Sequence, residues 1–408
     1  MIVIIGAGVS GLTCAKYLKD NGVEALVLEA SAEVGGRVKT DSVAGFKLDR
    51  GFQVLLTSYP EAQKLLDYKA LNLKYLPSGA CIRMGNKYHV MPNPLKNWAT
   101  APQALLAPVS SLLDKIKVLQ LNINLRKAPE PLPAEPFDKI TTLDYLKQVG
   151  YSPTIINSFF KPFFRGVFLE KELKTDAKFF KFLFSQFAKG DVVIPQDGMQ
   201  AIPQQIAAHL NPQQIRLNTT VKQIVDNTIY LENGETIMAD KIVLATDATT
   251  AAKLLGQQPI TQFNATSCLY FYSTIPFKKF KKPYLIINTN NNELIAHLLV
   301  VSDVAPSYAP NGETLLSVSL VGKNNYSDGE LIIKIQQELI HWFTDEYNWQ
   351  HLRTYHIPEA LPQYFEGEHK HQPLKINSFT YQCGDYMAYP SLNAAMKTGR
   401  QVAEMLME

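Results

Sequence analysis

Three glycines near the amino terminus have a spacing that suits the binding of phosphate groups. Gly6, Gly8 and Gly11 stand in GAGVSG, after the branched apolar run of residues 2–5 and before a segment with helical spacing, residues 12–22. In a strand–turn–helix unit, the first glycine permits a tight turn and the second lets the backbone approach a pyrophosphate. The third lets the helix pack closely on the strand. This pattern predicts a dinucleotide-binding turn.

The residues around this turn complete the predicted unit. The helix amino terminus, with Ser10 in its first turn, offers unpaired N–H groups and the positive end of a dipole to phosphates. A second predicted strand, VEALVLE, ends at Glu29, and Ala30 follows it. The Glu29 carboxylate can accept hydrogen bonds from ribose hydroxyls and disfavours a 2′-phosphate. The alternative is a chance glycine pattern in an ordinary βαβ unit.

A second glycine motif follows within a few residues. The stretch EASAEVGGRVKT contains Gly35, Gly36 and Arg37, and it resembles the second signature of the flavin-containing amine oxidase superfamily. That superfamily includes monoamine oxidases, protoporphyrinogen oxidases and phytoene desaturases. The resemblance implies an FAD cofactor whose pyrophosphate lies against this motif. Two glycines allow a close approach of the backbone, and Arg37 can offset phosphate charge. A surface salt bridge is the alternative role for Arg37.

Two internal segments carry the resemblance further. LDRGFQVLLTSYPEA, residues 48–62, is similar to the family segment that runs under the flavin ring, which implies contacts from Gly51 and Phe52. An ordinary strand and turn would explain Gly51 but not the position of Asp49. Residues 216–247 predict hairpin strands followed by a buried strand, KIVLATD. There the resemblance implies that the backbone of Val221 contacts adenine, and the alternative is a structural meander.

The carboxyl end, YQCGDYMAYPSLNAAMKTGRQVAEML, resembles the closing motif of the same family. The resemblance implies that Gly384 and Asp385 approach the ribitol chain, whereas helix capping is the alternative for Asp385. It also implies that a helix beginning at Ser391, Leu392 and Asn393 points its positive end at the flavin. Pro390 and Ala394 stand where the family often has glycine. No cysteine stands where covalent attachment is expected, so we predict noncovalent FAD.

These motifs predict an α/β protein with a discontinuous, Rossmann-like FAD-binding domain and a mixed α+β substrate-binding domain. We assign residues 1–65, 190–262 and 375–408 to the FAD-binding domain, and residues 66–189 and 263–374 to the substrate-binding domain. A chain of 408 residues is long enough for two domains. The proline-rich segment 128–137 predicts an extended loop.

Composition limits the partners and the compartment. Apolar residues make up 46% and charged residues 19% of the chain, as in soluble globular proteins, and the net charge of +3 does not indicate a nucleic-acid-binding protein. Four scattered cysteines indicate neither a zinc site nor a disulfide framework, which fits a cytoplasmic protein. His369 and His371 lie in a polar stretch that we interpret as a solvated loop, so we expect no metal. The oligomeric state is left open.

The chemistry is the least determined part of the sequence. A second GxGxxG motif is missing, which argues against a nicotinamide domain and favours oxygen, a quinone or another carrier as electron acceptor. The amine oxidases of the family usually carry a lysine facing the flavin, and Ser267 stands at the corresponding position. His356 and Tyr364 are candidates for contact with a substrate, whereas His297, within the predicted strand LIAHLLVV, is interpreted as a core histidine. We assign no catalytic residue.

Resemblance to the desaturase and protoporphyrinogen oxidase branch predicts oxidation or desaturation of a largely apolar, isoprenoid-, carotenoid- or porphyrinogen-like substrate. One alternative is an amine oxidase without the usual lysine, and another is a non-catalytic flavoprotein that binds FAD or lipid. KFFKFLFSQFAK, residues 178–189, predicts a helix with crowded aromatic rings. Either these rings form the core and wall an apolar pocket, or they make peripheral contact with a membrane.

Overall fold

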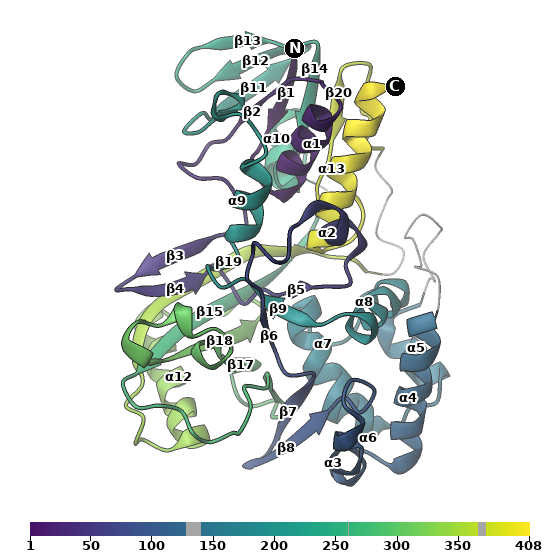
Figure 1. Cartoon of the computed structure of the whole chain (residues 1–408), viewed down its shortest axis with the longest axis vertical. Helices are drawn as coiled ribbons and strands as arrows, with labels where there is room; N and C mark the ends of the chain where they lie inside the picture. The colour runs from purple at the N-terminus through teal and green to yellow at the C-terminus, as the bar shows by residue number, and fades with distance from the viewer. Residues whose placement is uncertain (128–139, 260, 366–372) are drawn as a thin grey trace.

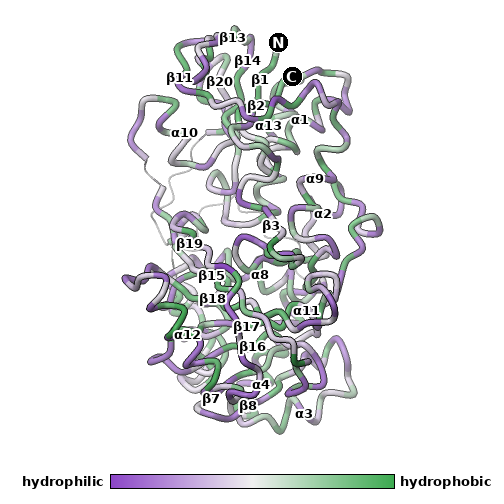
Figure 2. The backbone as a smooth tube through the Cα atoms, turned by 90° about the vertical axis from the view of Figure 1, so that its left-hand side faces the viewer, coloured by the Kyte–Doolittle hydropathy of each residue, from purple (hydrophilic) through white to green (hydrophobic). Residues whose placement is uncertain are grey.

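A computed structural model describes residues 1–127, 140–259, 261–365 and 373–408. The proline-rich segment 128–137, together with His369 and His371, lies outside these residues, so neither expectation is tested. The described chain forms two stacked parts, with both termini in the upper part of Figure 1. Helices α3 (Ala101–Leu106) and α4 (Leu112–Lys127) lie at the opposite end in Figures 1 and 2.

The upper part is built on a five-stranded parallel sheet with the order β10-β2-β1-β14-β20. Its strands are β10 (Ile215–Arg216), β2 (Ala25–Leu28), β1 (Ile2–Ile5), β14 (Lys241–Leu244) and β20 (Thr380–Gln382). Every neighbouring pair is parallel. The carboxyl ends of all five strands therefore meet at one edge, where open α/β sheets bind ligands.

Different elements cover the two faces of this sheet. Alternate residues of a strand point to opposite faces, so Ile4 packs towards α1 (Val9–Asp20) while Val3 and Ile5 pack towards a β-meander. The meander consists of β11 (Val221–Val225), β12 (Thr228–Leu231) and β13 (Thr236–Met238), paired antiparallel as the sequence predicts. Helix α13 (Leu392–Met407) lies beside α1, and a Cβ at Gly399 would come within 2.3 Å of the Ser10 carbonyl oxygen.

The lower part contains a seven-stranded sheet with the order β19-β15-β18-β17-β16-β7-β8. Its strands are β7 (Gly79–Met84), β8 (Lys87–Pro92), β15 (Phe263–Ser273), β16 (Ile286–Asn288), β17 (His297–Val300), β18 (Thr314–Val321) and β19 (Gln350–Pro362). Helix α12 (Asp328–Phe343) covers one face with Leu331, Ile335 and Leu339. The hydropathy of this sheet and its helix can be followed in Figure 2.

Helices form the other side of the lower part. Beyond α3 and α4 these are α5 (Thr142–Gln148), α6 (Pro153–Ile155), α7 (Lys161–Phe168) and α8 (Ala177–Lys189). Small elements lie where the two parts meet: β3 (Thr40–Val43), β4 (Phe46–Asp49), β5 (Leu55–Leu56), β6 (Lys74–Tyr75), β9 (Val192–Ile194) and α2 (Pro60–Leu65). Helices α9 (Ala201–Ala207) and α10 (Ala248–Leu254) pack in the upper part, and α11 (Val301–Val304) packs beside β18. None of the helices in the described ranges combines the length and apolarity needed to cross a bilayer.

The phenylalanine-rich segment is interior helix. Phe179, Phe180, Phe182 and Phe184 of α8 are buried, and Phe180 packs edge-on against Phe164 with ring centroids 4.8 Å apart. The core interpretation is therefore right, and contact of these rings with a membrane is wrong. Such rings bury large apolar areas, which makes them a strong driving force for folding of the lower part.

The architecture confirms an α/β fold. The strands of the parallel sheet come from residues 2–28, 215–244 and 380–382, whereas the seven-stranded sheet comes from residues 79–92 and 263–362. We accordingly propose the discontinuous domain boundaries expected from the sequence. The chain therefore passes from one part to the other several times, and it does so beside the carboxyl edge of the parallel sheet.

Asp49 joins the two parts at these crossings. Its carboxylate accepts hydrogen bonds from Thr40 Oγ1 at 2.6 Å, Met199 N at 2.9 Å and Tyr308 OH at 3.0 Å. Its carbonyl oxygen accepts a fourth from Tyr270 OH at 2.9 Å. Burial raises the pKa of the Asp49 carboxyl to about 6, although the three hydrogen bonds to it favour the ionised form. The position of Asp49 is therefore explained by structure, without contact with a ligand.

Asp49→Asn should remove a pH dependence of folding stability. The folded-state pKa of Asp49 lies above its unfolded value, so its contribution is fully present below the unfolded pKa and is lost as pH rises through the folded pKa. Relative to the variant, the wild type should lose about 2 kcal/mol of unfolding free energy between pH 4.5 and 7.5. Urea unfolding at both pH values measures this difference, and a difference independent of pH would contradict it.

Candidate functional site

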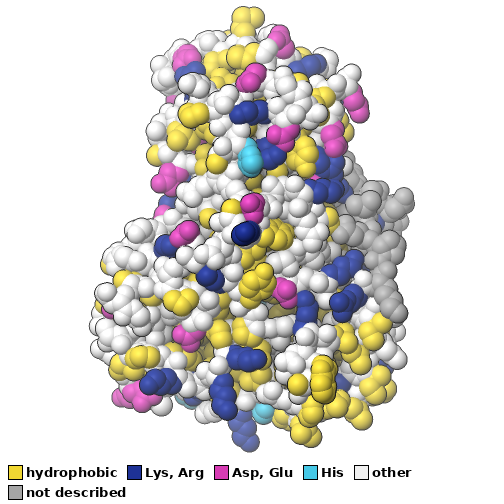
Figure 3. All heavy atoms as spheres, viewed as in Figure 1, with side chains coloured by type: hydrophobic (Ala, Val, Ile, Leu, Met, Phe, Trp, Pro, Cys, Tyr) yellow, Lys and Arg dark blue, Asp and Glu magenta, His cyan; other side chains and the backbone are white. Residues whose placement is uncertain are grey.

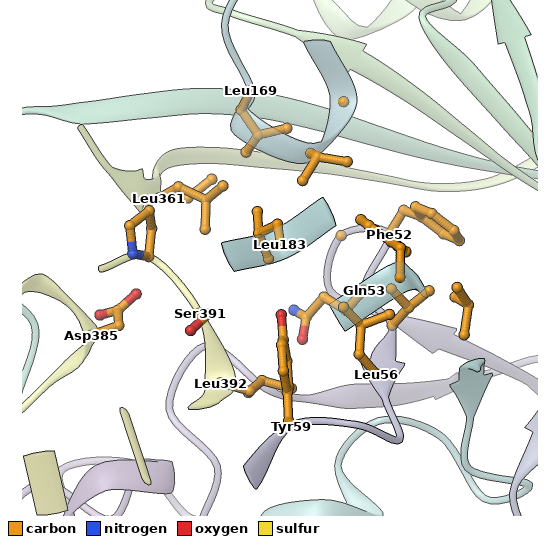
Figure 4. Close-up of a pocket in the computed structure, with 18 of the residues that line it drawn as sticks. Phe52, Gln53, Leu56, Tyr59, Leu169, Leu183, Leu361, Asp385, Ser391 and Leu392 are labelled. Atoms are coloured by element: carbon orange, nitrogen blue, oxygen red, sulfur yellow. The ribbon is translucent and has the colours of Figure 1, made fainter. Parts of the chain in front are cut away.

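A cavity of about 1110 Å³ runs from the carboxyl edge of the parallel sheet into the helical side of the lower part. Figure 4 shows its middle, where Asp385, Ser391 and Leu392 face Phe52, Gln53 and Tyr59 across the space. Residues from both parts of the molecule line it. The cavity is thus one continuous space, with a polar end at the sheet and an apolar end among the helices.

The first glycine motif forms the polar end. Gly6 has φ +107°, and a Cβ there would come within 2.8 Å of the Ala245 carbonyl oxygen. Gly8 also lines the cavity, but a Cβ there would meet nothing within 4 Å. Gly8 is the N-cap of α1 and supplies no side-chain cap, so the first N–H groups of that helix are open to an anion.

Gly11 has the packing role that the motif predicts for its third glycine, but it is not in direct contact with the cavity. A Cβ there would lie 2.1 Å from the Gly6 carbonyl oxygen. Gly11 therefore keeps the turn itself compact. Its effect on a ligand is indirect, through the shape of the Gly6–Gly8 segment.

The second glycine motif packs directly on the first. Gly35 forms a β-bridge with Gly8, and Gly35 N donates to the Ala7 carbonyl oxygen at 2.9 Å. A Cβ at Gly36 would approach the Gly8 Cα to 3.3 Å. Gly35 and Gly36 have φ values of +129° and +60°, which favour glycine. The two motifs consequently form one backbone wall, and both line the cavity.

Glu29 stands at the end of β2 and faces the same space. Its Oε2 accepts a hydrogen bond from Ala7 N at 2.8 Å, and its Oε1 accepts from Ser31 N and Ser31 Oγ at 2.9 and 2.7 Å. These contacts orient the carboxylate, and each oxygen retains lone-pair capacity. The arrangement suits acceptance of hydrogen bonds from ribose hydroxyls.

Arg37 and Asp385 form an ion pair that sequence inspection did not anticipate. They are 348 positions apart, and an Arg37 guanidinium nitrogen donates to Asp385 Oδ1. A second nitrogen donates to the Ala360 carbonyl oxygen at 3.0 Å. That carbonyl lies in an irregularity of β19, where residues 357–361 run opposite only residues 264–266 of β15. Arg37 thus forms a salt bridge, as the alternative interpretation expects, and both side chains also line the cavity.

The carboxyl-terminal motif meets the same wall. Gly384, Ser391 and Leu392 line the cavity, and Ser391 Oγ caps α13 by accepting from Ala394 N at 3.0 Å. Asn393 is a correction to the expected set, because it is buried away from the cavity. Its Oδ1 accepts from Glu61 N at 3.0 Å and its Nδ2 donates to Tyr389 OH, so it ties α13 to α2.

The structure brings together most of the residues selected from the sequence. Those lining the cavity are Gly6, Gly8, Ser10, Glu29, Ala30, Gly35, Gly36, Arg37, Gly51, Phe52, Val221, Gly384, Asp385, Ser391 and Leu392. Sequence analysis missed Gln53, Tyr59, Thr246 and Asp247, which also line it. For Thr246 and Asp247 the signal was present, since they directly follow a buried parallel strand. No comparable signal marks Tyr59.

Ser267 does not face the cavity. Its Oγ is 2.9 Å from His356 Nδ1 and accepts from Asn324 Nδ2 at 3.1 Å. The neighbouring Thr266 lines the cavity instead, because successive strand residues point to opposite faces. Ser267, the residue selected at the lysine position, therefore points away from the cavity. Neither Thr266 nor Ser267 is a lysine, so the inference of a missing lysine at this strand is unaffected.

His297, His356 and Tyr364 differ in their position relative to the cavity. His297 lines the cavity, and its Nε2 donates to the Pro162 carbonyl oxygen at 2.7 Å. Burial lowers the pKa of His297 to about 4, so this imidazole is neutral at physiological pH. His356 pairs with Asp328 near the surface and Tyr364 is buried against Phe179, and neither lines the cavity.

The polar end fits FAD on three structural grounds. The α1 terminus has no side-chain cap, Gly8 leaves open space beside it, and Glu29 presents an oriented carboxylate. Ser391 and Leu392 place the α13 terminus at the same cavity. None of the residues lining the cavity is a cysteine, which agrees with noncovalent binding. In the described ranges, no cluster of side chains could hold a metal ion.

Comparisons with known proteins agree with this geometry. A family model described as flavin containing amine oxidoreductase matches residues 9–407. The chain is 24% identical to 15-cis-phytoene desaturase of Capsicum annuum, over 100% of this chain and 78% of that protein. It is 22% identical to coproporphyrinogen III oxidase of Bacillus subtilis, over 90% and 88%.

A crystal structure of a putative protoporphyrinogen oxidase from Exiguobacterium sp. 255-15 shares the fold. Its TM-score to this chain is 0.75, with 16% identity and coverage of 99% of this chain and 98% of that one. At this identity the likeness concerns the fold alone. It extends to both parts of the molecule, so the arrangement of the two parts around the cavity is included.

Gly8→Ala should weaken FAD binding without destabilising the apoprotein. The new Cβ meets no protein atom, so it occupies space reserved for the ligand. We expect the FAD dissociation constant to rise at least about tenfold, because the pyrophosphate needs close backbone approach here. Gly329→Ala is the matched control, since its Cβ also meets nothing but does not face the cavity. Fluorescence titration and apoprotein melting measure both effects; equal FAD affinities would contradict the assignment.

Arg37→Gln should weaken FAD binding more in the wild type than in an Asp385→Asn background. Removing the guanidinium leaves the Asp385 carboxylate uncompensated beside a negatively charged pyrophosphate, whereas the asparagine carries no charge. We expect a coupling of about 1 kcal/mol or more in the double-mutant cycle. FAD titration of the four proteins measures it, and additive losses would mean that the ion pair has no part in binding.

Proposed function

Because the chain belongs to the flavin-containing amine oxidoreductase family, we propose that this FAD-dependent oxidoreductase oxidises or desaturates a largely apolar, isoprenoid- or carotenoid-like molecule. Support comes from the character of the cavity beyond its cofactor end. Leu56, Leu183, Phe184 and Phe187 are among the side chains that line it there. Such walls favour an extended hydrocarbon ligand.

The partners of the cationic side chains in the cavity favour a hydrocarbon substrate over a polycarboxylate. Three cationic side chains line the cavity, and each already has an oxygen partner in the described chain. Arg37 pairs with Asp385, and Arg50 pairs with Asp41 at 2.8 Å. Lys115 Nζ donates to the carbonyl oxygens of Leu105 and Ala107. A polycarboxylate such as a porphyrinogen would find no free cation here, so a hydrocarbon fits better.

The chain's own residues would bind and orient this substrate. FAD, when bound at the polar end, would supply the two-electron oxidation and take up the hydrogen removed from the substrate. The aromatic and aliphatic walls would exclude water, and neutral His297 adds no charge to them. The electrons would pass to oxygen, a quinone or another carrier. All four cysteines are free and buried, which supports a reducing, cytoplasmic environment for the protein.

Amine oxidation is the second candidate, and the cavity argues against it. Lys115 is the one lysine among the cavity-lining residues of the described chain, and it lies on α4, far from the carboxyl edge of the parallel sheet. Its ammonium group is held by two carbonyl oxygens, and burial lowers its pKa. A non-catalytic flavoprotein that binds FAD or lipid is the third candidate.

Anaerobic flavin bleaching separates these three functions. We expect phytoene in detergent to reduce the bound flavin, while benzylamine, a polyamine and coproporphyrinogen III reduce it at least about tenfold more slowly, because catalysis needs a cavity complementary to its substrate. Stopped-flow absorbance measures the rates. Rapid bleaching by an amine would establish amine oxidation, and bleaching by none of the compounds would support the non-catalytic alternative.

Two variants test whether the substrate uses the cavity. Ala104 lines the cavity and Gln103, its neighbour on α3, is exposed and does not line it. Ala104→Trp should therefore slow bleaching by the hydrocarbon while the protein keeps its FAD. Gln103→Trp is the matched control and should bleach at the wild-type rate. Equal bleaching rates in the two variants would mean that the substrate does not bind in this part of the cavity.

A further inference from the structure

Exposed apolar side chains concentrate on one surface of the molecule. Among the described residues, 21 large apolar side chains are exposed, and eight of them lie within residues 98–123. We call these eight the α3–α4 surface: Trp98, Leu105, Leu106, Leu112, Leu113, Ile116, Leu119 and Ile123. Trp98 is 85% exposed and Leu106 is 82% exposed. Figure 3 shows hydrophobic side chains gathered at the lower right, over this end of the molecule.

The outward face of α4 is apolar where a surface helix is normally polar. Leu112, Ile116, Leu119 and Ile123 follow the spacing i, i+4, i+7, i+11, which places them on one side of the helix. The opposite side contains Asp114 and Leu121, which are buried. The helix therefore has two apolar faces, one packed in the protein and one that no element of the described chain covers.

The cavity opens on this surface. Leu105, Ile116 and Leu119 belong to the α3–α4 surface and also line the cavity. Ala101 and Ala104 of α3 line it beside them. A hydrocarbon leaving the cavity here would pass directly onto exposed apolar side chains. The surface is thus continuous with the proposed substrate site.

Cations outnumber carboxylates within the segment that carries the α3–α4 surface, although Lys96 pairs with Asp191 at 2.8 Å. Between residues 95 and 126 the sequence has four cations, Lys96, Lys115, Lys117 and Arg126, and one carboxylate, Asp114. Asp114 is buried and accepts hydrogen bonds from Ser111 Oγ and Ser152 Oγ at 2.6 and 2.7 Å. No carboxylate of this segment is therefore exposed. The combination of apolar side chains, a tryptophan and cations matches the interface of an anionic bilayer.

We propose that the α3–α4 surface docks on an anionic phospholipid bilayer, from which the substrate enters the cavity. The docking stands on the surface itself, while the transfer of substrate rests on the proposed function. A protein partner or a second copy of the chain seated here would cover the cavity mouth. A bilayer leaves the mouth facing the phase in which a hydrocarbon dissolves. Peripheral membrane contact is thereby assigned to α3 and α4 rather than to the interior helix α8.

Vesicle flotation of the FAD-loaded protein tests the docking. The variant Trp98→Ser/Leu106→Ser/Leu112→Ser removes three side chains of the α3–α4 surface that do not line the cavity. The matched control Met238→Ser/Ile333→Ser/Ile340→Ser removes three exposed apolar side chains elsewhere. With phosphatidylcholine vesicles containing phosphatidylglycerol, the wild type and the control should float. The surface variant should lose at least about tenfold in partition coefficient, because apolar burial scales with area.

Several results would overturn the docking. The first is that the wild type stays at the bottom of the gradient. The second is that the surface variant floats as well as the control. A third is dimerisation that the surface variant abolishes while no protein floats, which would assign the surface to a second copy. Melting temperature and FAD content verify that each variant is folded. The wild type should also float less with pure phosphatidylcholine and at high salt, because screening weakens attraction to anionic headgroups.

Flavin bleaching tests the transfer separately. With phytoene supplied in vesicles, the surface variant should bleach at least fivefold more slowly than the control, while phytoene in detergent should bleach both equally. Equal rates from vesicles would overturn the transfer. If the wild type floats but no apolar compound bleaches its flavin, the proposed function fails and the docking stands.

Discussion

The backbone contact between the two glycine motifs is the constraint on which the site depends. Gly35 donates to the Ala7 carbonyl oxygen, and Gly36 lies against the Gly8 Cα so closely that a side chain there would crowd it. This contact fixes the path of the chain after Gly36 and delivers Arg37 to Asp385. Three segments distant in sequence are held together at one edge of the parallel sheet. A dinucleotide needs such an edge, because its phosphates are bound by backbone groups that a longer side chain would block.

The same contact sets the relation between the two parts of the molecule. Arg37 also donates to the Ala360 carbonyl oxygen on β19, which belongs to the seven-stranded sheet. Asp49 adds a second connection through Tyr308 and Tyr270. Polar contacts therefore fix the cofactor end of the cavity relative to the apolar end, and those of Asp49 are buried. Such contacts are directional, so they restrict relative movement more than apolar packing does.

The two ends of the cavity differ in charge, because one end must bind a charged cofactor and the other an apolar ligand. Glu29, Arg37 and Asp385 gather charge at the sheet, where FAD carries phosphates and hydroxyls. Beyond this region the cationic side chains have internal oxygen partners and His297 is neutral. An apolar ligand loses nothing there, whereas an ion would lose hydration without a partner. The α3–α4 surface continues the apolar character outward to solvent, which is why the mouth of the cavity and the proposed bilayer contact coincide.

The sequence by itself determined the local units. The strand–turn–helix around Gly8, the meander of residues 221–238, and the family resemblance followed from short-range spacing and turn chemistry, and the structure or the family match confirms them. FAD follows from these because the phosphate-binding turn is a local device. Most of the residues that were selected from the sequence also line the cavity.

Only the tertiary structure decided which face of each helix or strand points inward, and therefore which residues line the cavity. It placed Thr266 rather than Ser267 in the cavity and removed Gly11 and Asn393 from it. It also buried the phenylalanine rings of α8 while leaving leucine and isoleucine side chains of α3 and α4 exposed. The Arg37–Asp385 pair joins the chain ends, which no local pattern records. A one-residue shift in a strand reverses its faces, and a helix shows its apolar side equally to a core or a membrane. Only the packing of neighbouring elements resolves those choices.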